Sequence, residues 1–159
     1  MMFLSEVNVP LIVEIALLII VLVSAFIVGS AFVIRDLRRS YKELFRHQSK
    51  FDIELRKIVN LISKATKNET MAKYDNLVIK DLPYVDKKAL LDLIDHLYTE
   101  HENESEQFAY VRETYENLQE QRRSLDATIL LFNQKISLFP FNLYSKVMKL
   151  RKRQYYTHK

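Results

Sequence analysis

Three ionisable side chains in the second half of the sequence have a spacing that could hold a divalent cation. Asp92, His96 and Glu100 are four residues apart, so a helix would place them on one face, with His101 nearby. Carboxylate and imidazole groups are common zinc ligands. The set is not an HExxH motif, however, and nothing in the surrounding sequence excludes water or supplies a fixed fourth ligand. We therefore predict no metal site here.

Other motifs that carry chemistry are missing from the sequence. The chain has one glycine and no cysteine, so it lacks a glycine-rich phosphate loop, a thiolate metal site and a disulfide. No Ser-His-Asp arrangement stands out either. We predict no catalytic, cofactor-binding or metal-binding residues, which favours a non-enzymatic function.

The clearest signal in the sequence is the apolar run Leu11–Ile34. As a helix this run would extend about 36 Å, which is enough to cross a bilayer with some tilt. It is too long for a cleaved signal peptide and no basic residue precedes it, whereas Arg35 and many other basic residues follow. The positive-inside rule then places the N-terminus outside. We predict a short extracytoplasmic segment (1–10), a transmembrane helix (11–34) and a cytoplasmic helical domain (35–159).

Two long apolar seams with helical spacing predict an all-α fold, in which the transmembrane helix runs into a long antiparallel bundle. The first seam comprises Leu37, Tyr41, Leu44, Phe51, Leu55, Ile58 and Ile62. The second comprises Phe108, Val111, Tyr115, Leu118, Leu125, Ile129, Phe132, Ile136 and Phe139. No Pro or Gly separates the first seam from the apolar run, so one continuous helix should reach about Lys64. A shorter helix is expected over 86–99, and residues 76–82 fit a short helix or an extended stretch.

Each seam has one polar interruption, which is Gln48 in the first and Arg122 in the second. Antiparallel pairing would bring these two residues together as a buried polar pair, because a buried arginine without partners is costly. The alternative is that Arg122 reaches solvent from a partly exposed seam.

A helix stop follows the second seam. Phe139-Pro140 should end the helix, because proline lacks a donor and disfavours helix at the preceding residue, and Asn142 could cap a new one. The new helix would be amphipathic and would lie along the membrane, with a basic collar that faces anionic lipid. The collar comprises Arg35, Arg38, Arg39, Lys146, Lys149, Arg151, Lys152 and Arg153. The alternative is a helix that packs on the bundle and has solvated lysines. Nucleic-acid binding is not expected, because no such motif is present.

The opposite end of the bundle is predicted to be acidic. The residues concerned are Asp92, Asp95, Glu100, Glu102, Glu104 and Glu106. They form either a docking surface for a basic protein partner or a solvated face that keeps this tip soluble. In the apolar run, Ala25 and Gly29 have the small-xxx-small spacing that permits self-association of membrane helices, so a homo-oligomer is a further expectation.

A cluster of residues in the C-terminal part has a recognisable order. Leu118, Arg122 and Asp126 precede the aromatic-Asn pair Phe132-Asn133, and then come Ile136, Phe139-Pro140 and Asn142. Together with the Lys, Arg and aromatic residues that follow, the stretch 115–156 resembles the C-terminal half of the LemA family. That resemblance implies a single-pass, helical-bundle protein of a bacterial cell membrane, with no established catalytic residues. The function expected is a membrane-anchored scaffold or adaptor, and the alternative is a lipid-organising protein that self-associates.

Overall fold

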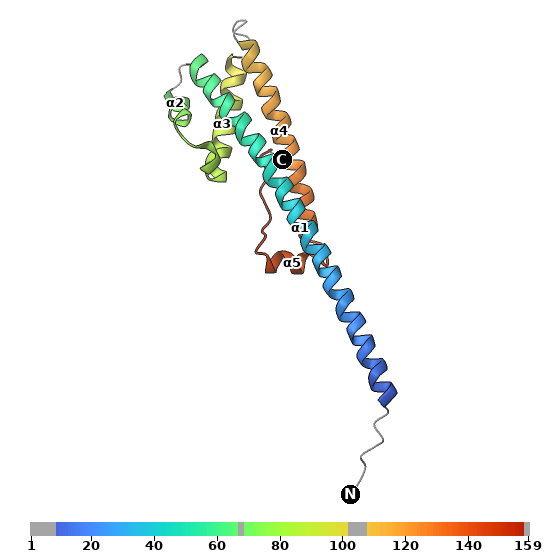
Figure 1. The fold of residues 1–159 in the computed structure, drawn as a ribbon. Helices are drawn as coiled ribbons and strands as arrows, with labels where there is room; N and C mark the ends of the chain where they lie inside the picture. Colours follow the sequence, from blue (N-terminus) through green and yellow to red (C-terminus); the bar gives the residue numbers. More distant parts are fainter. Residues whose placement is uncertain (1–8, 67–68, 102–107, 158–159) are drawn as a thin grey trace.

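The computed structural model describes residues 9–66, 69–101 and 108–157, and every regular element in those ranges is a helix. The elements are α1 (Val9–Thr66), α2 (Glu69–Asp75), the 3-10 helix η1 (Ile79–Asp81), α3 (Tyr84–His101), α4 (Phe108–Lys135) and α5 (Phe141–Val147) (Figure 1). The prediction of an all-α chain is confirmed.

Helix α1 joins the apolar run to the rest of the molecule without a break. Its 58 residues correspond to a length of about 87 Å. Its only proline, Pro10, lies in the first turn, where the missing N–H would have had no partner in the helix. The N-terminal part of α1 projects beyond the other helices (Figure 1), and its apolar side chains are exposed. Within the described ranges α1 is the one helix long and apolar enough to cross a membrane.

Helix α4 packs lengthwise on the C-terminal part of α1 and runs in the opposite direction (Figure 1). Polar contacts fix the register, because Ser124 bonds to His47 (3.0 Å) and Lys135 bonds to Asp36 (3.0 Å). The predicted seams supply most of the core between the helices. Their fully or nearly fully buried members are Leu37, Leu44, Phe51, Leu55, Ile58, Ile62, Val111, Leu118, Leu125, Ile129, Phe132 and Ile136.

The seam prediction is wrong for Phe139, which is 78% exposed. Helix α4 ends at Lys135, and the chain then turns through residues 136–140, so Phe139 no longer follows the helical period. The stop therefore comes before the proline. Pro140 itself forms the N-cap of α5, without a side-chain cap bond.

Asn142 is not the cap of α5, contrary to prediction. It lies inside α5, because its N–H donates to the carbonyl of Leu138 (2.8 Å) in a turn that already leads into the helix. The side-chain Oδ1 of Asn142 is buried and accepts no hydrogen bond from the described part of the chain. Of the predicted stop, the break near Pro140 is found but the role of Asn142 is different.

Helices α2 and α3 and the 3-10 helix η1 cover the distal half of α1. Met71 and Ile79 are buried there, and α3 confirms the helix expected over 86–99. Near the start of α3, Lys87 is 1% exposed, and its ammonium donates to Asp52 of α1 at 2.7 Å. Burial raises the pKa of Asp52, although the hydrogen bond from Lys87 acts in the opposite direction. A buried ion pair thus ties α3 to α1.

Candidate functional site

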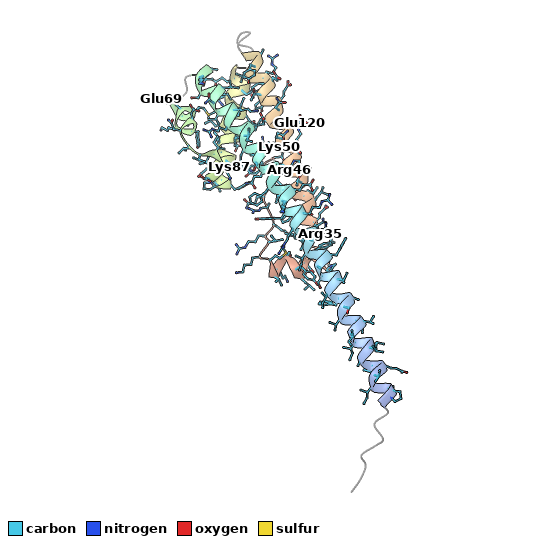
Figure 2. All side chains as sticks on the ribbon, viewed as in Figure 1. Arg35, Arg46, Lys50, Glu69, Lys87 and Glu120 are labelled. Atoms are coloured by element: carbon cyan, nitrogen blue, oxygen red, sulfur yellow. The ribbon has the colours of Figure 1, made fainter. Side chains whose placement is uncertain are left out.

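The end of the domain nearest the predicted span combines cations with an exposed apolar helix. Arg35, Arg38 and Arg39 follow the predicted span on α1, and all three are exposed. Figure 2 shows Arg35 on α1 near the level of α5. These three residues of the predicted collar therefore lie on α1 directly after the apolar run, with exposed side chains.

Helix α5 lies against the apolar run itself. The hydroxyl of Tyr144 is hydrogen-bonded to that of Ser30, which belongs to the predicted span. Tyr144 is half-buried by this packing, whereas Leu143 and Val147 of the same helix are 53% and 82% exposed. Phe139, just before α5, is exposed as well. We call the exposed side chains of Leu138, Phe139, Leu143 and Val147 the apolar foot.

The predicted basic helix is shorter than expected. Helix α5 ends at Val147, and Lys149 then adopts a left-handed conformation (φ 55°). The N–H of Lys149 donates to the carbonyl of Lys146, and that of Leu150 donates to Ser145 (2.8 Å). These two bonds form a Schellman motif, which ends the helix and redirects the chain.

The collar is consequently divided into two groups. Lys146 and Lys149 remain close to α5, with exposed side chains. Arg151, Lys152 and Arg153 are also exposed, but they belong to an extended C-terminal tail (151–157) that leaves α5 and follows α1 toward the middle of the domain (Figure 1). The prediction that Lys146 to Arg153 lie on one helix along the membrane is wrong for Arg151, Lys152 and Arg153, because the left-handed turn at Lys149 directs the tail away.

Polar side chains of α4 bind the backbone of this tail. Asn133 donates to the carbonyl of Arg153 (2.8 Å) and accepts from its N–H (2.9 Å). Asp126 accepts from the backbone N–H groups of Tyr156 (2.8 Å) and Thr157 (2.7 Å). Asp126 and Asn133 are buried, so the tail satisfies polar groups that would otherwise be costly inside the domain.

Arg122 binds the tail too, and not its predicted partner. Arg122 is 4% exposed, and its guanidinium donates to the carbonyl of Tyr156 through both Nε and Nη2, and to Asp95 of α3 through Nη1 (3.0 Å). These bonds use three of the five N–H donors, and none of them goes to Gln48, so the predicted pair is not formed. Gln48 is half-buried on α1. The antiparallel register brings the two positions to similar levels, but α3 and the tail lie closer to Arg122.

Three polar residues of α4 therefore act together on the tail, and sequence reasoning assigned none of them to it. Arg122, Asp126 and Asn133 have the spacing i, i+4, i+11, which places them on one stripe of the helix. This polar stripe runs beside the apolar seam, with Asp126 next to Leu125 and Asn133 next to Phe132. Polar residues that recur at a helical period beside a core seam are the signal that could have indicated a bound segment.

Asp95 is an internal partner, contrary to its assignment to a partner-binding surface. Its carboxylate accepts from the Tyr115 hydroxyl (2.9 Å) and from Gln119 (3.0 Å), besides Arg122. Burial, followed by the hydrogen bond to Asp95, raises the pKa of Tyr115 to about 12. Asp95 therefore joins α3 to α4.

The other predicted acidic residues divide into two groups. Asp92 and Glu100 have exposed positions on α3, whereas Glu102, Glu104 and Glu106 lie outside the described residues. His96 and Glu100 approach within 3.8 Å on the exposed face of α3. In the described part of the chain, no group of three or more His, Cys, Asp or Glu side chains is arranged to hold a metal ion.

Comparisons with known proteins give no relative for this chain. No family model matches it, and no curated protein or solved structure is significantly similar to it.

Proposed function

We propose that the chain is a non-enzymatic, single-pass membrane protein of a bacterial cell, whose cytoplasmic helical domain serves as a scaffold or adaptor. The observation that carries this proposal is the unbroken helix α1, which provides both the apolar run and the core of the domain. Because the proposed membrane anchor and the domain share one helix, the domain would have a fixed position at the membrane. Such a position suits a protein that holds a partner there.

The apolar foot supports a position of the domain directly against the inner leaflet. Its four side chains are exposed at the end of the domain nearest the predicted span, and Tyr144 of α5 is hydrogen-bonded to Ser30 of that span. Amphipathic segments at this depth insert apolar side chains near the lipid headgroups while nearby cations attract anionic lipid. Arg35, Arg38, Arg39, Lys146 and Lys149 supply those cations.

The same foot favours a second candidate function, lipid organisation. In that case the foot and its cations would be the active surface, and copies of the chain would associate through their spans. The scaffold function instead needs an exposed face far from the membrane. Asp92 and Glu100 on α3 and Glu120 on α4 offer such an acidic face for a basic partner.

The resemblance to the LemA family supports the scaffold proposal. Three of the residues that carry it, Arg122, Asp126 and Asn133, are those that bind the tail. A shared way of docking the tail would explain why the likeness is concentrated in this region. We propose that the chain is a divergent LemA-like protein.

Orientation is the first element to test, and the absence of cysteine makes it simple. Single cysteines at position 8 (Asn8→Cys) and on α4 (Glu120→Cys) are treated in intact cells with a membrane-impermeant maleimide. The proposed topology predicts labelling at position 8 before permeabilisation and at position 120 only afterwards. The reverse pattern, or labelling of both in intact cells, would refute the cytoplasmic position of the domain.

The two candidate functions are separated by photo-crosslinking in living cells. A photoreactive residue replaces Glu100 on α3 or Val147 on α5, and Arg56, an exposed position on α1, is the matched control. A scaffold yields a discrete protein adduct from position 100 that is lost in the Asp92→Asn background. A lipid organiser yields lipid adducts and chain dimers from position 147 and no protein adduct from position 100, a result that would overturn the scaffold proposal.

A further inference from the structure

A cavity of about 340 Å³ lies where the tail crosses the domain. Four parts of the chain enclose it: α1, the segment from η1 to the first turn of α3, α4, and the tail. Such a volume lies within the range of small-molecule sites. The cavity exists because Asn133 and Asp126 hold the tail across the opening between the helices.

The polar part of the cavity wall carries one sign of charge. Four basic residues line it, namely Lys80, Lys87, Lys152 and Arg153, and no acidic residue is among the described residues of the wall. Lys87 is neutralised by Asp52 behind the wall. The other three have exposed side chains and form no ion pair with any residue in the described ranges. Like charges gathered around a concave surface focus a positive potential that attracts an anion.

The remaining wall suits an anion with an organic body. Leu125 and Ile129 of α4 provide an apolar surface, and Gln48 of α1 adds an amide that can donate or accept. The backbone of Arg153 is held in place, because the Asn133 side chain bonds to both its N–H and its carbonyl. The Arg153 guanidinium is exposed and can form a paired hydrogen bond to a phosphate, to which the two lysines add further positive charge.

The position of the cavity indicates the source of the anion. Leu44, which lines it, is ten residues beyond Ile34, so the cavity stands about 15 Å along α1 from the end of the predicted span. A phosphate on a lipid headgroup remains near the bilayer surface, whereas a soluble phosphate compound reaches this height freely. The positive charge of the cavity wall is the same in either membrane orientation. That the ligand is a soluble cytosolic compound, however, rests on the proposed orientation, which places the domain in the cytoplasm.

We propose that this cavity binds a small, soluble organic phosphate, with its phosphate held by Lys80, Lys152 and Arg153 and its organic part against Leu125 and Ile129. The tail thus serves as one wall of a ligand site. Nothing in the scaffold or lipid-organising functions requires such a site.

The test is calorimetric titration of the full chain in a neutral detergent with pyrophosphate and with adenosine 5′-monophosphate. Both probes should bind saturably and more weakly as salt is raised. The double substitution Lys152→Gln/Arg153→Gln should weaken binding by roughly tenfold or more, because it removes charge-assisted bonds. Lys80→Gln, on a different segment, should weaken it as well.

The matched control is Lys42→Gln/Lys50→Gln, which removes two positive charges from exposed positions of α1, outside the cavity. It should bind the probes as the unchanged chain does, and circular dichroism of every variant should report the same helix content. No saturable binding, or equal loss in the control and in the tail variants, would overturn the proposal.

A second arm distinguishes the two sources of phosphate. The chain is placed in nanodiscs of phosphatidylcholine alone or with phosphatidylglycerol, and binding of adenosine 5′-monophosphate is repeated. Equal affinity in both supports a soluble ligand. Competition by phosphatidylglycerol that disappears in Lys152→Gln/Arg153→Gln would assign the cavity to a lipid headgroup and overturn the soluble source.

Discussion

Replacing Asp126 by alanine should release the tail and leave the helices in place. The Asp126 carboxylate accepts from the backbone N–H of Tyr156 (2.8 Å), from that of Thr157 (2.7 Å) and from the Thr157 hydroxyl (2.6 Å). The Asp126→Ala substitution removes all three bonds at once. The seam between α1 and α4 lies on neighbouring positions of the helix and keeps its contacts.

The size of the effect follows from the exposure of the donors. A hydrogen bond to a charged group contributes about 1.5–3 kcal/mol, and a buried donor left without a partner costs about 1–3 kcal/mol. Thr157 is exposed, so its groups regain water when released, whereas Tyr156 is buried. We therefore expect the docking of the tail to weaken by about 2–4 kcal/mol, which corresponds to a roughly 30- to 1,000-fold larger open population.

Hydrogen exchange resolved to single amides is the assay. The amides of Arg153 and Tyr156 should exchange faster in Asp126→Ala by that factor, while those of buried core positions such as Leu118 stay protected. Glu120→Ala, at an exposed carboxylate on the same helix, is the control and should change stability by less than about 0.5 kcal/mol. Unchanged exchange at Tyr156, or equal acceleration at Leu118, would refute the separate docking of the tail.

Three further outcomes are expected. Asp52→Ala should lower the free energy of unfolding, measured in urea, by about 3–5 kcal/mol, because it leaves Lys87 charged and buried. The double variant Asp52→Ala/Lys87→Met should recover most of that loss. Equal urea midpoints for the single and the double variant would contradict this reasoning. Phe51→Ala should lower the free energy of unfolding by about 3–5 kcal/mol, since its side chain is fully buried. Burial raises the pKa of Tyr156 to about 12, so between pH 10 and 12 the folded state keeps a proton that the unfolded state loses, and stability should fall as the pH rises through this window. Tyr156→Phe should make that fall shallower in pH-dependent melting, with Tyr115 still contributing, and an unchanged slope would show that Tyr156 has no part in it.

Local periodicity explains what could be predicted about the fold. Leu44, Phe51 and Leu55 recur with the helical repeat, and a residue's position on a helix face depends only on its near neighbours in sequence, so the seams and the uninterrupted course of α1 were predictable. The end of α5 was not predictable in the same way. A left-handed lysine at position 149 has no strong sequence signal, since glycine is the usual residue there.

The candidate site was predictable only in part, because its contacts join segments far apart in the chain. Arg122 was expected either to pair with Gln48 or to reach solvent, and instead it is buried with partners from α3 and the tail, Asp95 and Tyr156. Their placement depends on how three helices and an extended segment pack together. The same non-local packing makes Asp95, predicted as part of a partner-binding surface, a half-buried link between α3 and α4.

The continuity of α1 also has a mechanical consequence. In the proposed orientation there is no hinge between anchor and domain, so the helix behaves as a lever: a change in its tilt or rotation within the bilayer turns the whole cytoplasmic body by the same angle. Bilayer thickness, or contact with a neighbouring span at Gly29, would thereby set the direction in which the distal acidic face points. In that orientation the membrane anchor would therefore also determine the direction in which the domain faces.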